Sequence, residues 1–155
     1  MSLAKGLHLL ALAVWFGSMI FFSFVVAPTV FRNFPRETAG EIVGHIFPKY
    51  YAVATGAGAV ALATLLLTGA SGGRATVAKL VLLLTMLGLQ STAGYVIRPQ
   101  AVVVKEQMHA TDAADEAALA PLRARFGALH RNAMILNSIV IVLGAVVLVM
   151  SGWNP

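Results

Sequence analysis

Cysteine and charged residues are the most conspicuous absences from this sequence. The chain has no cysteine, which excludes disulfides, thiolate metal sites and cysteine nucleophiles. Charged residues make up only 11% of it, against about a quarter in a soluble domain. There is no run of five or more basic residues, so the net charge of +5 is not a nucleic-acid signal. Hydrophobic residues make up 59% of the chain, and this composition predicts an integral membrane protein.

Motifs for common catalytic chemistry are absent as well. The sequence has no glycine-rich phosphate loop, no nucleophile elbow around a serine and no zinc-binding pair of histidines flanking a glutamate. The predicted membrane spans contain no Asp or Glu, which argues against a proton pump driven by intramembrane carboxylates. We therefore expect a protein that is not an enzyme and that carries no cofactor.

Four long apolar segments are predicted to cross the membrane as helices. A helix needs about 20 residues to cross the ~30 Å hydrocarbon layer. The segments run from about 3 to 27, 51 to 70, 77 to 97 and 133 to 151. A cleaved signal peptide is the alternative for the first segment, but its apolar run is too long for one. The expected fold class is all-α, with residues 1–155 forming one antiparallel four-helix membrane domain.

The even number of spans places both chain termini at one end of the bundle, here named end A. The two long connections lie at the opposite end, named end B. Lys5, Arg74 and Lys79 are the basic residues near end A, and the other eight of the 11 fall at end B. Because basic residues favour cytoplasmic loops, we predict that end B is cytoplasmic and that both termini lie outside the cytoplasm, in a multi-pass protein of the cell membrane.

Both long connections are predicted to be partly helical. Residues 35–47 alternate apolar and polar positions at helical spacing, which predicts a short amphipathic helix in the membrane interface that ends at Pro48. This helix would serve either as an anchor or as a lid over a site. Residues 105–131 are expected to lie outside the membrane, with Asp112 capping a helix and Pro121 restarting it before the fourth span.

Polar side chains at membrane depth are costly and mark candidate functional residues. In the first span, His8 and Trp15 lie seven residues apart, so they share a stripe that faces a neighbouring helix. The candidate binding residues in the other spans and at their ends are His130, Arg98, Asn137, Tyr50, Tyr51, Gln90 and Ser91. They belong to different spans, so their roles depend on how the helices pack.

Two interpretations of these polar residues stay open. Either they make interhelical hydrogen bonds, each on the order of 1 kcal/mol, or they form a site that binds an anion or relays a proton. The third span ends at Arg98 where the fourth begins at His130, and Asn137 lies two helical turns further along the same face. We therefore expect His130, Arg98 and Asn137 to form one interhelical cluster at end B.

Metal and haem binding are further alternatives. Soft ligands for an ion such as Cu(I) are Met19, Met86 and Met134, with His8 or His130. Methionines in apolar helices more often fill space. A haem held by two histidines needs both at one depth, but His8 lies near end A and His130 near end B. His45 can partner His130 only if its helix folds inward.

Five segments carry a family resemblance: HLLALAVWFG (8–17), FRNFPRETAG (31–40), FPKYY (47–51), RP (98–99) and LRARFGALHRNAMILN (122–137). On these segments the sequence resembles the transmembrane protein 205-like family of small four-span membrane proteins and, more distantly, copper-resistance-type membrane proteins. The resemblance implies four helices and a membrane location. Because the animal member is associated with tolerance of platinum drugs, it also implies export or trafficking of soft metal species.

Two kinds of function remain. The first is transport, efflux or tolerance of a small solute or soft metal, and the second is a non-catalytic membrane subunit, assembly factor or scaffold. A haem-binding membrane redox protein is a third. A transport path should run from end B to end A, whereas polar residues thin out past Ser18 and Thr85. The expected partners are the lipid bilayer and a second copy or another membrane protein, since four helices enclose little water, with no role for nucleic acid.

Overall fold

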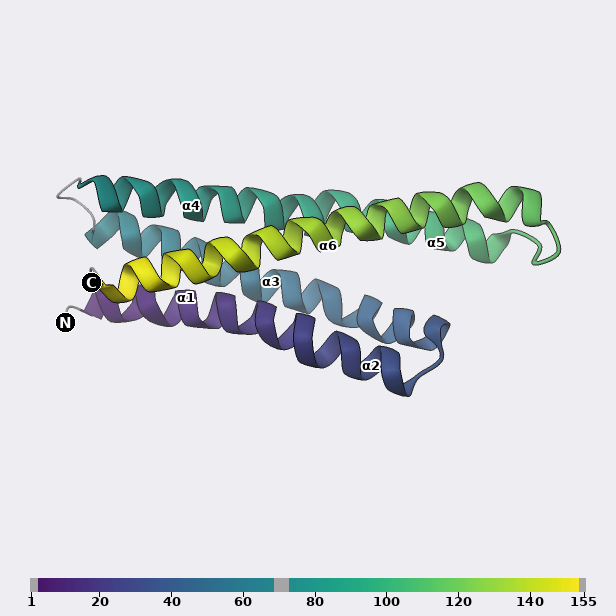
Figure 1. Ribbon diagram of the computed structural model, residues 1–155, viewed down its shortest axis with the longest axis horizontal. Coiled ribbons are helices and arrows are strands. Elements are labelled where there is room, and N and C mark those ends of the chain that lie inside the picture. Colours follow the sequence, from purple (N-terminus) through teal and green to yellow (C-terminus); the bar gives the residue numbers. More distant parts are fainter. Residues whose placement is uncertain (1–2, 69–72, 154–155) are drawn as a thin grey trace.

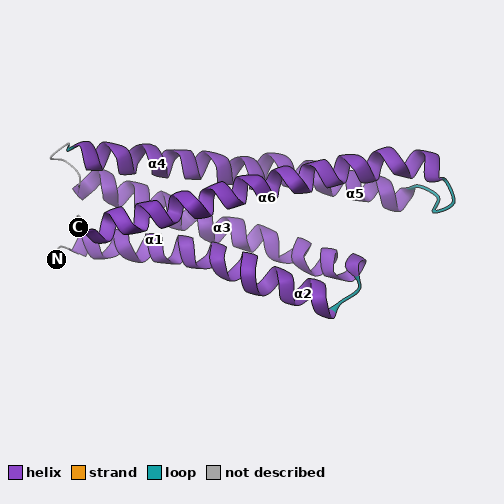
Figure 2. Ribbon diagram, in the orientation of Figure 1, coloured by secondary structure: helices purple, strands orange, loops and turns teal. Residues whose placement is uncertain are grey.

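The computed structural model describes residues 3–68 and 73–153, and the regular elements within them are all helices (Figures 1 and 2). In chain order they are α1 (Leu3–Phe21), the π-helical turn η1 (Phe22–Val26), α2 (Ala27–Asn33), α3 (Arg36–Thr68), α4 (Arg74–Ser91), the π-helical turn η2 (Thr92–Ile97), α5 (Arg98–Ala110) and α6 (Glu116–Trp153). They join into four continuous rods, because η1 and η2 connect their neighbouring α-helices without a break.

Each rod is long and apolar enough to cross a membrane, with 31, 33, 37 and 38 residues in chain order. This confirms the predicted all-α fold class and indicates a membrane protein. At 1.5 Å per residue the rods are about 46 to 57 Å long, more than the ~30 Å hydrocarbon layer. Part of every rod therefore lies beyond the hydrocarbon. Large apolar side chains on the outer faces, such as Phe24 and Leu67, are exposed as expected for contact with lipid.

The rods form an antiparallel bundle in which α1 packs against α3 and α6, and α4 packs against the same two helices (Figure 1). The start of α1, the end of α3, the start of α4 and the end of α6 meet at end A. At end B the α2–α3 hairpin and the α5–α6 hairpin diverge, and the α5–α6 hairpin extends further. The bundle is therefore closed at one end and splayed at the other.

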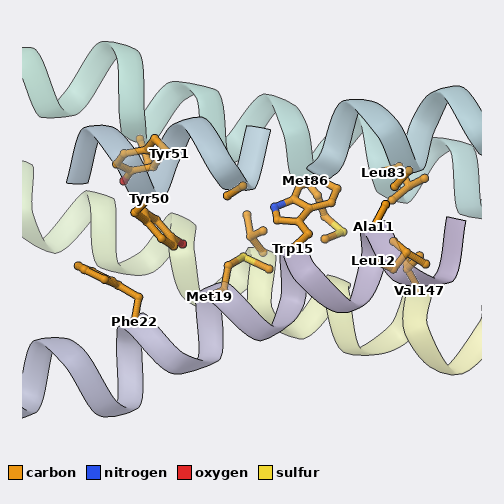
Figure 3. Packing of buried hydrophobic residues seen from close by; sticks show 14 of the residues in the cluster. Ala11, Leu12, Trp15, Met19, Phe22, Tyr50, Tyr51, Leu83, Met86 and Val147 are labelled. Atoms are coloured by element: carbon orange, nitrogen blue, oxygen red, sulfur yellow. The ribbon is translucent and has the colours of Figure 1, made fainter. Parts of the chain in front are cut away.

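The core is built in layers that repeat every seven residues along all four rods. The layer nearest end A holds His8, Leu65, Lys79 and Ser151, the middle layer holds Trp15, Gly58, Met86 and Gly144, and the layer nearest end B holds Phe22, Tyr51, Ala93 and Asn137. All are buried except Asn137, which is half-buried. A seven-residue repeat is the spacing of left-handed helix bundles, and Figure 3 shows Met86 beside Trp15 in the middle of the core.

Small residues allow the middle layer to pack closely. A Cβ at Gly58 would lie 2.9 Å from Cη2 of Trp15 and 2.7 Å from Cδ2 of Leu87. A Cβ at Gly144 would lie 3.0 Å from Cδ2 of Phe16 and 3.3 Å from Cε of Met86. In a membrane, where lipid is as apolar as leucine, such close approach supplies the packing energy that holds helices together.

The first and third rods continue past prolines that sequence reasoning placed near their ends. The N–H of Ala27 bonds to the carbonyl of Phe22, and the N–H of Arg98 bonds to that of Ala93, five residues back in each case. Each of these π turns ends two residues before a proline, Pro28 or Pro99, which has no N–H to donate. The first rod therefore continues as helix to Asn33, past the predicted span end near residue 27, and the third continues through α5, past the predicted span end near residue 97.

The helix predicted over 35–47 forms, but the prediction that it ends at Pro48 is wrong. α3 is continuous from Arg36 to Thr68 with Pro48 inside it. A proline removes the hydrogen bond to the carbonyl four residues back, here that of Gly44. Nη2 of Arg98 donates to this oxygen at 3.2 Å. An arginine from a neighbouring rod therefore replaces the missing donor, and the segment forms the outer part of the second rod rather than a separate helix.

The second long connection is a helical hairpin, and two details of its prediction were wrong. Asp115, not Asp112, caps α6, because its Oδ1 accepts from the N–H of Ala118 at 3.0 Å. Asp112 accepts from the N–H of Ala114 at 2.9 Å within the turn. Pro121 lies inside α6 instead of restarting a helix. The residue four positions before it, Ala117, is exposed, so solvent can satisfy the freed carbonyl. The predicted end of the second span at Ala70 lies outside the described residues.

Candidate functional site: a cleft at end B

A cleft of about 460 Å³ opens between the outer part of α3, the η2–α5 segment and the first half of α6. Its volume falls in the range of small-molecule sites, roughly 300 to 1,000 Å³. The apolar side chains that line it include Phe47, Tyr51, Ile97, Phe126 and Leu129. The cleft exists because the two hairpins diverge at end B, where the layered core stops.

Charged and titratable side chains from three helices also line the cleft. α3 contributes Glu41 and His45, α5 contributes Arg98, Lys105, Glu106 and His109, and α6 contributes His130. With the histidines neutral, the two cationic and two acidic side chains cancel in formal charge. Across the mouth, Nε2 of His109 lies 3.6 Å from Oε1 of Glu37, and both side chains are largely exposed. The cleft thus combines apolar walls with polar groups.

Arg98 is held in the cleft by its place in the chain and by one hydrogen bond to a neighbouring helix. It begins α5, directly after the π turn and before Pro99, and donates one N–H to the carbonyl of Gly44. A guanidinium has five N–H groups. Among the described residues, no carboxylate oxygen lies within 4.0 Å of the Arg98 side chain. Arg98 therefore has donor capacity for an acceptor in the cleft.

The inner wall of the cleft is aromatic and rests on a hydrogen-bonded support. The ring of Tyr51 lies against Gly94, where a Cβ would be 2.6 Å from Cδ1 of the ring. Tyr50 points elsewhere: its ring stacks on Phe22 with centroids 4.7 Å apart. The Tyr50 hydroxyl donates to Oδ1 of Asn137 at 3.3 Å, and Nδ2 of Asn137 donates to Oγ of Ser23 at 3.0 Å.

The structure separates the three residues that were expected to form one cluster. His130 and Arg98 line the same cleft, from the fourth and the third rod. Asn137 does not line it and bonds instead to Tyr50 and Ser23. Tyr51 joins His130 and Arg98 in the cleft, whereas Tyr50 belongs to the group around Asn137. The exposed His130 side chain faces the cleft without a hydrogen bond to another described residue.

Gln90 and Trp15 form a separate polar contact in the middle of the bundle. The indole N–H of Trp15 donates to Oε1 of Gln90, and Nε2 of Gln90 reaches Oγ1 of Thr55 at 3.5 Å. The hydroxyl of Tyr95 lies 3.5 Å from the same Thr55 oxygen. Ser91 is half-buried beside Gln90 along the chain. These contacts tie together three rods and match the role of interhelical hydrogen bonds.

The candidate metal ligands are spread over the bundle. His8 is buried at end A, where its Nδ1 donates to the carbonyl of Ala61 at 2.9 Å. Its Nε2 is buried and has no partner in the described part of the chain. Met19 and Met86 meet beside Gly144 in the middle layer, and Met134 is 53% exposed. Within residues 3–68 and 73–153, no three His, Asp or Glu side chains are placed to hold a metal.

Sequence reasoning missed several residues of the cleft. Lys105, Glu106 and His109 were assigned only to a connection outside the membrane, and His45 was considered beside His130 only as a haem ligand whose helix would have to fold inward. A spacing signal existed: Glu41 and His45 are four residues apart, and Glu106 and His109 are three apart, so each pair shares a helix face. What the spacing could not show is that these faces turn toward each other, which depends on α3 running straight through Pro48.

Comparison with known proteins places the chain in a family without an assigned activity. An uncharacterized protein of Aquifex aeolicus (strain VF5) is 36% identical over 86 residues. The aligned segment covers 56% of this chain and 62% of that relative, less than two thirds of its length. No solved structure matches the chain. The model of a family described as "Domain of unknown function (DUF4149)" matches residues 10–110, about two thirds of the chain, and the protein belongs to this family.

Proposed function

We propose that this protein is a non-catalytic membrane protein that binds a small amphiphilic anion in the cleft at end B. The observation that carries the proposal is the position of Arg98, a cation with spare N–H donors, in a cleft walled by Phe47, Tyr51 and Phe126. Arginine is the side chain best suited to carboxylate, sulfonate and phosphate groups. Aromatic and aliphatic walls suit the apolar part of the same ligand.

The position of the cleft in the membrane favours an amphiphile over a freely diffusing ion. The rods are longer than the hydrocarbon layer, so end B reaches the depth at which lipid headgroups lie. The ligand that fits both the arginine and the apolar walls has an acidic headgroup on an apolar body. Such a ligand can come from two sources, an anionic lipid of the bilayer or a single-chain amphiphile that enters from it.

Transport of a small solute or a soft metal is supported less well by this conformation. Trp15, Met19, Leu83 and Val147 lie between the cleft and end A, and each is fully buried. A path through the bundle would require these packed layers to separate. The resemblance to the transmembrane protein 205-like family still favours a role in export or tolerance, in which the cleft would be the site where cargo is received.

The orientation and partners of the protein also remain proposals. The excess of basic residues at end B favours placing the cleft on the cytoplasmic face, with both termini outside the cytoplasm. Labelling of a C-terminal tag in intact cells tests this, and a tag that is protected would reverse the orientation. A second copy of the chain or another membrane protein is the expected partner besides lipid.

Binding is tested with the full chain in nanodiscs of zwitterionic lipid and a fluorescent alkyl sulfonate, whose charge is constant with pH. The sulfonate should bind, and the alcohol of the same chain length should bind more weakly. Arg98→Gln should weaken sulfonate binding by about tenfold or more, since a hydrogen bond to a charged group contributes roughly 1.5 to 3 kcal/mol. The matched control is Arg123→Gln, because Arg123 is exposed and pairs with Glu116 away from the cleft.

Two results would contradict the proposal. One is equal binding of the sulfonate and the alcohol, and the other is equal loss in the Arg98 and Arg123 variants. Replacing part of the zwitterionic lipid with anionic lipid then identifies the source of the ligand. A bilayer lipid as ligand predicts competition with the sulfonate probe, and a single-chain amphiphile predicts none.

A further inference from the structure

Three histidines from three different helices line the one cleft that holds Arg98. His45 lies on α3, His109 on α5 and His130 on α6. Histidine is the side chain whose charge ordinarily changes between about pH 5 and pH 8. The chain has four histidines, and the fourth, His8, lies at end A. All but one of the histidines are therefore gathered at the proposed binding site.

We propose that the cleft is a proton-linked anion site, in which protonation of His45, His109 and His130 strengthens binding of the anionic headgroup. This inference rests on the proposed function and specifies how the same site is regulated. Its physical basis is the charge balance of the cleft, which goes from formally neutral to as much as +3 as the histidines gain protons. Binding of an anion and uptake of protons then favour each other.

The other charged groups set the size of this effect. From α3, Glu41 lies one turn before His45, and Glu37 faces His109 at 3.6 Å. From α5, Arg98, Lys105 and Glu106 line the cleft with His109, and α6 contributes only His130 among the charged and titratable groups that line the cleft. The arginine and lysine are balanced by Glu41 and Glu106, so the histidines decide the sign of the net charge.

The direction and magnitude follow from elementary electrostatics. Each unit charge several ångströms from the ligand, at a dielectric near that of water, changes binding by a factor of roughly two. Three such charges should make sulfonate binding about tenfold tighter at pH 5.5 than at pH 8. High salt should reduce the difference, because the mouth of the cleft is open to solvent.

The test measures the dissociation constant of the alkyl sulfonate from pH 8 to pH 5.5 in zwitterionic nanodiscs, where neither probe nor lipid changes charge. The wild-type protein should bind more tightly as the pH falls. The triple variant His45→Gln, His109→Gln, His130→Gln should lose the pH dependence, so its dissociation constant should be the same at pH 5.5 and at pH 8. His8→Gln is the control, and its pH profile should match that of the wild-type protein.

Two outcomes overturn the inference. A flat wild-type profile shows that the histidines do not act on the ligand, and a profile that persists in the triple variant assigns the effect to the glutamates. Both can occur while binding at pH 8 still depends on Arg98, which would leave the proposed function standing. Absence of Arg98-dependent binding at every pH removes the proposed function itself.

Discussion

The two ends of the bundle contain similar kinds of polar side chain but treat them differently. At end A, His8, Lys79 and Ser151 are buried in one layer between tightly packed helices. At end B, His130, Lys105 and Glu106 line a cleft that is open to solvent. The polar residue types alone therefore do not decide whether a site forms. The packing of the helices around them does.

The difference arises where the seven-residue repeat stops. The repeat holds from His8 to Phe22 in the first rod and from Lys79 to Ala93 in the third, and in both rods its last residue lies at the start of a π turn. A π turn adds one residue, which rotates the rest of the helix by about 100° relative to the layers before it. In the third rod this rotation ends at Arg98, which lines the cleft. The π turns therefore mark the boundary between the closed and open halves.

The largest expected effect is a loss of stability when the packed half of the bundle is disrupted. Gly58→Ala places a Cβ 2.7 Å from Leu87 and 2.9 Å from the ring of Trp15, which should lower the free energy of unfolding by about 1 to 3 kcal/mol. Gly56→Ala is the control, since nothing lies within 4 Å of its added Cβ. Denaturant titration in micelles measures both. Equal stability of the two variants would show that the middle layer is not tightly packed.

The next effect concerns the link between the second and third rods. Arg98→Met leaves the carbonyl of Gly44 without a donor, because Pro48 cannot supply one. In a Pro48→Ala background the helix provides its own N–H, so the same substitution should be less destabilising. A double-mutant cycle should show a coupling of about 1 kcal/mol. Additive effects would mean that Arg98 does not replace the helical donor.

The smallest effect is on sulfonate binding, which should hardly change when the hydrogen bonds behind the cleft are removed. Asn137→Ala removes bonds to Tyr50 and Ser23 and should cost about 0.5 to 2 kcal/mol of stability, as for other interhelical hydrogen bonds. Asn132→Ala, at an exposed position on the same helix, should cost less. Sulfonate binding should change by less than about twofold in either variant. Loss of binding in folded Asn137→Ala protein would place Asn137 in the site.

Sequence reasoning recovered the fold because its signals are local. Apolar length predicted the four helices, as the structure confirms. The spacing of His8 and Trp15 predicted a stripe that faces a neighbouring helix, and both side chains are buried. It failed at Pro48, where proline was taken as a helix end. The donor that keeps that helix intact is Arg98, which lies 54 residues from Gly44 in the chain, and no local pattern contains it.

The candidate site was predicted only in part for the same reason. Arg98 and His130 were placed together because the third span was predicted to end at one and the fourth to begin at the other, and they do line one cleft. Asn137 was assigned to them by helical spacing, yet it bonds to the first and second rods. Residue spacing shows which side chains share a face of a helix. Which other helix that face contacts depends on how the helices tilt, and π turns and glycines change that tilt. His109 escaped notice, and His45 was considered only as a haem ligand, because their faces meet only after that tilt.

The central claim is that the bundle has an anion-binding cleft at end B and is closed at end A. This claim can be tested directly by labelling introduced cysteines, because the chain has none of its own. Ala101→Cys introduces a thiol in the cleft, and Ser151→Cys introduces a nearly isosteric one in the buried layer at end A. We predict that an anionic methanethiosulfonate reagent modifies position 101 rapidly, that the alkyl sulfonate slows this reaction, and that position 151 reacts little. Equal reactivity at the two positions, or no protection of position 101 by the sulfonate, would contradict the account.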